Sequence, residues 1–108
     1  VDPTISLNDY LRRSTPLSGS GDSLHFATLG AKLGCGEGGC GACVVSLSRY
    51  DISIKKVVHL AVNSCLRPLA SCDGWAITTV EGLGGSEHKN GFHPVQERLA
   101  KFHGSQCG

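Results

Sequence analysis

Apolar residues recur at helical spacing near both ends of the chain. Within residues 2–13 they fall at i, i+3 and i+4, behind an S-x-x-D capping pattern at positions 6–9. Residues 93–104 carry Pro94 at the first helical position and Gly104 just past the last one. The pattern predicts one helix in each range. Their apolar faces are formed by Leu7, Tyr10 and Leu11 in the first and by Val95, Leu99 and Phe102 in the second.

Three β-branched, partly alternating stretches between these helices predict strands over residues 44–48, 55–62 and 76–80. The third is entered through the pair Asp73-Gly74, which favours hairpin turns. Residues 14–31 are rich in Ser, Gly and Pro and have no sustained period, so they predict a long loop. Strands combined with short helices predict a small α+β domain.

Composition narrows the class of protein. The chain has 108 residues, of which 40% are hydrophobic and 18% charged, and its net charge is +1. These values are typical of a globular domain and give no reason to expect nucleic acid or an anionic membrane as a partner. No apolar run approaches the roughly 18 residues of a transmembrane helix. The chain begins with Val1 rather than Met and stops within an apparent motif, so we expect a fragment or a processed piece of a longer protein.

Six cysteines stand at positions 35, 40, 43, 65, 72 and 107. An even number could mean a disulfide scaffold, but three of them crowd into one short loop, which favours metal binding in a reducing compartment. The spacing C-x4-C-x2-C with a distant fourth cysteine is that of plant-type 2Fe–2S sites. A zinc ribbon would need two C-x2-C pairs or paired histidines, which the chain lacks. Cys72, beside a turn, is expected to be a free thiol.

Glycines separate the clustered cysteines in "GCGEGGCGAC". A cluster with four thiolates carries net negative charge, and backbone N–H groups can stabilise it if the chain wraps with its amides inward. Such wrapping uses positive φ angles, which glycine permits. We therefore assign this role to Gly36, Gly38, Gly39 and Gly41. The overlapping G-x-G-x-x-G pattern from Gly34 leads into a strand rather than a helix, so a dinucleotide site is disfavoured.

Four segments together closely resemble the N-terminal iron–sulfur region of the xanthine dehydrogenase/aldehyde oxidase family of molybdenum hydroxylases: "KLGCGEGGCGACVV", "NSCL", "TTVEGLG" and "HPVQERLAKFHGSQCG". The resemblance implies a β-grasp, ferredoxin-like 2Fe–2S domain over residues 1–88, lacking its N-terminal hairpin. Residues 89–108 would begin a helical domain for a second 2Fe–2S cluster. The implied ligands of the first cluster are Cys35, Cys40, Cys43 and Cys65. Cys107 would be the first ligand of the second, incomplete cluster, and Gln106 a molybdopterin contact.

The same resemblance implies an electron-transfer role. The chain would relay single electrons from the molybdenum centre toward FAD, without catalytic residues of its own. Its partners would be the FAD and molybdenum domains of the same enzyme, in a cytoplasmic homodimer. The segments "CGACVVSLSRYD" and "NGFHPV" favour an aldehyde oxidase over a xanthine dehydrogenase. The loop over 14–31 is longer than the family leads us to expect.

Three alternatives stay open. A free-standing plant-type ferredoxin would typically be strongly acidic and would lack the C-terminal extension. A small iron–sulfur subunit of a multi-subunit bacterial hydroxylase would differ in total length. A zinc-binding structural module would give no visible colour, so metal analysis with an absorption spectrum separates it from an iron–sulfur protein.

Overall fold

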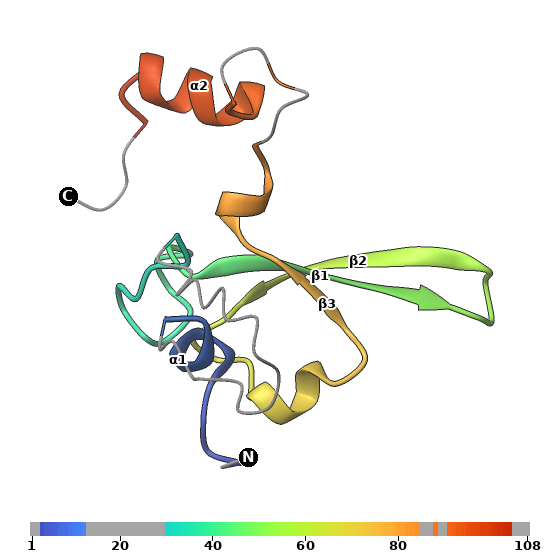
Figure 1. Cartoon of the computed structure of the whole chain (residues 1–108). Coiled ribbons are helices and arrows are strands. Elements are labelled where there is room, and N and C mark those ends of the chain that lie inside the picture. Colours follow the sequence, from blue (N-terminus) through green and yellow to red (C-terminus); the bar gives the residue numbers. More distant parts are fainter. Residues whose placement is uncertain (1–2, 13–29, 85–87, 89–90, 105–108) are drawn as a thin grey trace, which may run out of the picture.

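A computed structural model describes residues 3–12, 30–84, 88 and 91–104 of the chain. Two helices, three strands and two short 3-10 helices follow one another within these ranges (Figure 1). Their order is α1 (Leu7–Arg12), β1 (Val44–Asp51), β2 (Lys56–Asn63), η1 (Leu69–Cys72), β3 (Ala76–Thr78), η2 (Val80–Gly82) and α2 (Pro94–Lys101). The α+β class and the three predicted strands are therefore confirmed, although the first strand continues to Asp51 and the third ends at Thr78. Assignment to the β-grasp type stays a prediction.

The strands form one antiparallel sheet in the order β2-β1-β3. β1 and β2 make a long hairpin, in register from Val44 opposite Asn63 to Asp51 opposite Lys56. Figure 1 shows this hairpin extending well beyond the short β3. The fourth residue of its turn, Lys55, has a φ of 53°, which lies in the left-handed region.

The prediction that Asp73-Gly74 forms a hairpin turn is wrong. β3 pairs with β1 and not with β2, so the segment between β2 and β3 crosses over to the other edge of β1. Asp73 (φ −58°, ψ 133°) and Gly74 (φ 76°) are instead the central residues of a type II turn, which the Trp75 N–H closes by donating to the Cys72 carbonyl at 3.0 Å. The pair does form a turn, but which strand β3 pairs with depends on contacts between residues distant in sequence.

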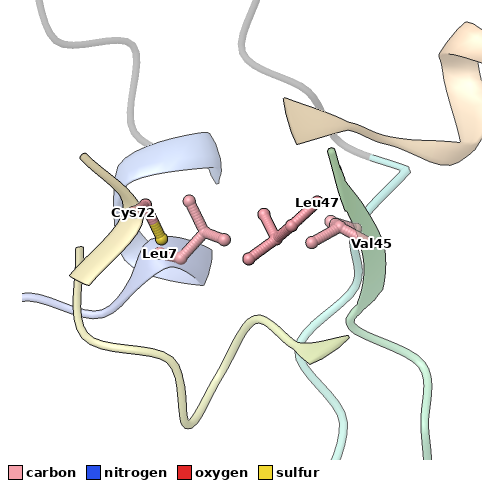
Figure 2. Packing of buried hydrophobic residues seen from close by; sticks show 5 residues of the cluster. Leu7, Val45, Leu47 and Cys72 are labelled. Carbon is pink, nitrogen blue, oxygen red and sulfur yellow. The ribbon is translucent and has the colours of Figure 1, made fainter. Parts of the chain in front are cut away.

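The hydrophobic core lies between α1 and one face of the sheet (Figure 2). Alternation along β1 turns Val45 and Leu47 inward, where Leu47 faces Leu7 of α1. Cys72 of η1 and Ala31 complete the buried set. The thiol of Cys72 thus behaves as a small apolar side chain.

α1 is shorter than the predicted range of 2–13 because the residues before it pair with another segment. Ser6 forms an isolated antiparallel bridge with Pro68, and the Leu7 N–H donates to the Arg67 carbonyl at 2.8 Å. The predicted capping contact is confirmed, since the Ser6 hydroxyl accepts the N–H of Asp9 at 3.1 Å. The start of the helix is therefore fixed to the segment that follows β2.

α2 begins as predicted at Pro94, behind a reciprocal cap. The His93 ring accepts the Val95 N–H at 3.1 Å, while the Gln96 side chain accepts the His93 N–H at 3.0 Å. At the other end the left-handed residue is His103 (φ 56°), and Gly104 lies one position further, its N–H donating to the Leu99 carbonyl at 2.8 Å. The position just past the helix end, which the sequence predicts for Gly104, is thus taken by His103, and Gly104 follows it.

The predicted apolar face of α2 is exposed, with Val95 at 55%, Leu99 at 53% and Phe102 at 81% accessibility. Figure 1 shows the helix standing apart from the sheet. A hydrogen bond from the Gln96 side chain to the Val80 carbonyl, at 3.0 Å, links it to η2. In the described part of the chain no helix combines the length and hydrophobicity needed to cross a membrane.

Candidate metal centre

The loop between Ala31 and β1 carries the three clustered cysteines and turns tightly around them. Gly36, Gly38 and Gly41 have φ angles of 68°, 80° and 73°. These left-handed values are strained for any residue with a side chain. Gly39, which the sequence grouped with them, does not share this conformation. Three of the four glycines assigned to wrapping therefore have the backbone that wrapping requires.

Backbone N–H groups of the loop point at its own sulfur atoms. Cys35 Sγ accepts from Glu37 at 3.4 Å, Gly39 at 3.2 Å and Cys40 at 3.4 Å. Cys40 Sγ accepts from Ala42 at 3.4 Å. The donors, the Glu37 N–H foremost, lower the pKa of Cys35 to about 7. The thiolate is the form of cysteine that binds metal. The inward N–H groups of this loop therefore favour the charged form that a metal site requires.

The sheet brings the other two thiols together. Cys43 directly precedes β1 and Cys65 follows β2 by two residues, so pairing of the strands sets them side by side. Burial, followed by a side-chain hydrogen bond with Cys43, raises the pKa of Cys65. Cys43 is 2% exposed, and its Sγ lies 3.8 Å from the Asn63 amide oxygen.

The four thiols therefore form two pairs, because Cys40 is likewise a side-chain hydrogen-bond partner of Cys35. Among the residues that the structure describes, no three His, Cys, Asp or Glu side chains gather as a site for one metal ion. A structural zinc ion needs four ligands at one point. A 2Fe–2S cluster instead takes two protein ligands on each iron, which two neighbouring pairs can supply.

The sequence predicts that Cys72 is not a ligand. Cys72 is in the core, 7% exposed, with its Sγ 3.7 Å from the Pro68 carbonyl oxygen. None of the five cysteines in the described ranges is in a disulfide bond. Gln106 and Cys107 fall outside the described residues, as do most of the loop over 14–31. The chain from Gly34 runs into β1 and opens no helix, as expected against a dinucleotide site.

Several residues that support the loop are not among the site residues that the sequence predicts. Asn63 donates from its amide to the Gly38 carbonyl at 3.5 Å. The side chain of Leu66 packs so closely that a Cβ on Gly38 would lie 2.7 Å from it. Asn8 and Ser64 are buried polar residues at the base of the loop. Asn63, Ser64 and Leu66 lie in the segment "NSCL" that carries the family resemblance, whereas Asn8 lies in none of the four segments.

The chain is similar over its full length to known oxidoreductases. It is 53% identical to a xanthine dehydrogenase/oxidase of Felis catus, 50% to aldehyde oxidase 1 of Oryctolagus cuniculus and 50% to an indole-3-acetaldehyde oxidase of Arabidopsis thaliana, matching 108 residues in each case. The chain spans about 7% of the length of each of these relatives. No protein-family model matches it. Among solved structures, quinoline 2-oxidoreductase from Pseudomonas putida 86 superposes with a TM-score of 0.67 at 28% identity, covering all of this chain and 52% of that one.

Proposed function

We propose that this chain, which is homologous over all of its length to enzymes of the xanthine dehydrogenase/aldehyde oxidase family, holds a 2Fe–2S cluster and relays single electrons within such an oxidoreductase. One observation carries the proposal: four thiols in two pairs, one of which receives three backbone N–H groups at Cys35. When bound, the cluster supplies one-electron oxidation and reduction.

The chain's own residues hold the ligands and balance charge. Cys35 with Cys40 would hold one iron, and Cys43 with Cys65 the other. The N–H groups on the loop would stabilise the negative charge of the thiolates and so help set the reduction potential. Thiolates that ligate iron are no longer available as nucleophiles, and backbone N–H groups are neither acids nor bases at neutral pH, so we place the substrate chemistry outside this chain.

The wider enzyme is part of the same proposal. The relatives are far longer than this chain, which leaves room for the FAD and molybdenum domains as its partners. The boundary proposed between residues 88 and 89 is supported by the separation of α2 and by its exposed apolar face. The proposal also includes a second 2Fe–2S cluster with Cys107 as a ligand and a molybdopterin contact at Gln106. It places the whole enzyme in the cytoplasm as a homodimer. The relatives named above include purine and aldehyde enzymes at similar identity, so substrate class needs its own assay.

Metal analysis with single replacements tests the proposal. Chain loaded with iron and sulfide is expected to hold two of each and to absorb visible light, with one unpaired electron after reduction. Alanine at any one of Cys35, Cys40, Cys43 or Cys65 should remove most of the iron. Cys72→Ala is the matched control and should keep it. A colourless protein with one zinc ion, or iron lost only in Cys72→Ala, would refute the proposal.

A further inference from the structure

A buried polar pair lies at the base of the ligand loop. Asn8 on α1 is 1% exposed and Ser64, next to β2, is 0% exposed. The Asn8 amide nitrogen lies 3.1 Å from the Ser64 hydroxyl. Burying such groups is unfavourable unless hydrogen bonds compensate.

Asn8 reaches the beginning of the loop. Its amide nitrogen donates to the carbonyls of Ala31, at 3.3 Å, and Lys32, at 3.2 Å. Arg12, one turn further along α1, donates to the same Ala31 carbonyl at 3.2 Å. The Lys32 N–H donates across the loop to the Ala42 carbonyl at 3.0 Å, which closes the loop at its base.

Ser64 reaches the end of the loop. Its hydroxyl donates to the Cys43 carbonyl at 2.6 Å, and its own N–H donates to the same oxygen at 3.3 Å. The Ser64 carbonyl in turn accepts the Asn8 N–H at 2.9 Å. One connected network therefore joins the residues before Cys35, the ligand Cys43 and the neighbour of Cys65.

We propose that Asn8, acting through Ser64, is a positioning residue of the four-thiol site and sets the spacing between the Cys35–Cys40 pair and the Cys43–Cys65 pair. The inference rests on the proposed function. Groups one layer behind metal ligands commonly fix ligand orientation in this way.

The hydrogen bonding of Asn8 is one-sided, since among the described residues its amide nitrogen has partners and its amide oxygen does not. Its amide oxygen is buried and has no hydrogen-bond partner within the described residues. An unsatisfied acceptor costs free energy that an apolar side chain would avoid. An apolar residue at position 8 would remove that unsatisfied oxygen, but it would also leave the Ala31 and Lys32 carbonyls and the Ser64 hydroxyl without this donor. What asparagine adds is a donor directed at Ala31, Lys32 and Ser64.

The test compares two neighbouring alanine replacements in the full chain loaded with iron and sulfide. Asn8→Ala should change the EPR line positions of the reduced protein and its visible circular dichroism, and should release iron to a chelator about tenfold faster. Leu7→Ala removes an equally buried side chain of the same helix that lacks these hydrogen bonds. It should lower the melting temperature at least as much while leaving the EPR line positions in place.

The outcomes separate this inference from the function it rests on. If the unaltered chain does not bind iron and sulfide, the proposed function fails. If it binds them and Asn8→Ala has the same spectra and iron release, the positioning role is wrong and the function stands. Equal spectral changes in Leu7→Ala would also refute the role. If Asn8→Ala does not fold, Ser64→Ala decides: it keeps the backbone hydrogen bond to Cys43 and should shift the same spectra by a smaller amount.

Discussion

Replacement of Gly34 by alanine should disable one half of the thiol site by direct contact. Gly34 precedes Cys35, the first proposed ligand, and is not among the glycines with positive φ, so alanine there causes no backbone strain of that kind. A Cβ on Gly34, however, would lie 2.8 Å from Cys40 Sγ, whereas ordinary contacts begin near 3.4 Å. The two atoms must therefore separate by at least 0.6 Å, the difference between these distances.

That displacement is large for a metal ligand. Distances between metal and protein ligands hold to within about 0.2 Å, so Cys40 would leave its place by about three times this tolerance. The side chain of Cys40 is short and cannot move its sulfur away without changing its rotamer. It would also lose the N–H of Ala42, now 3.4 Å away. If the backbone yields instead, the overpacking costs about 1–3 kcal/mol.

Gly39→Ala is the matched control. Its Cβ would meet Cys35 Sγ at 3.9 Å, an ordinary contact, and Gly39 also lacks a positive φ. Both replacements restrict the unfolded chain equally. Iron per chain and visible absorbance after loading should fall strongly in Gly34→Ala and stay near the unaltered value in Gly39→Ala. Equal iron in the two variants would contradict the argument.

Three further outcomes are expected. Gly38 has a φ of 80°, and a Cβ there would lie 2.7 Å from Leu66 Cδ1, so Gly38→Ala should lower the free energy of unfolding by about 1–3 kcal/mol in urea titrations. Adding Leu66→Ala should remove the steric clash but not the backbone strain, so it should restore only part of the lost stability. The Thr79 hydroxyl, more than the Gly30 N–H, lowers the pKa of Glu81. Glu81→Gln should therefore lose stability at pH 7, above the unfolded-state pKa, and the difference from the unaltered chain should vanish as pH falls through the lower folded-state value. Phe102→Ser, at a side chain 81% exposed, should change unfolding free energy by less than about 0.5 kcal/mol.

Local sequence patterns predicted where the helices and strands lie better than they predicted which strands pair. The β-branched runs located all three strands, yet β1 continues to Asp51 through "RYD", which has no apolar alternation and is ordered by its pairing with β2. The crossover to β3 could not be read from Asp73-Gly74, because a turn residue specifies backbone angles and not which strand follows. His103 takes the left-handed position expected for Gly104, since the closing hydrogen bonds of the helix end outweigh the modest cost there.

In the candidate site, too, the sequence reveals features that depend on local spacing and does not reveal contacts between distant residues. The cysteine spacing was visible in the sequence because a cluster dictates how far apart its ligands can stand along the chain. Asn8 was invisible because its partners are 23 to 56 residues away and belong to a loop and to the end of a strand. An asparagine within an apolar helix face gives no hint of such partners until the fold brings them to it.

The two thiol pairs differ in what assembles them, and under the proposed function this difference would couple cluster binding to folding. Cys35 is held by N–H groups two to five residues away, so its pair is built from local backbone. Cys43 and Cys65 become neighbours only when β1 and β2 are paired and Ser64 is bonded to the Cys43 carbonyl. A cluster that needs both pairs binds the folded chain and not the unfolded one, so its binding free energy adds to the stability of the sheet. Removal of iron by a chelator should therefore weaken the β1–β2 hairpin more than the Cys35 loop, and amide exchange along β2 would reveal it.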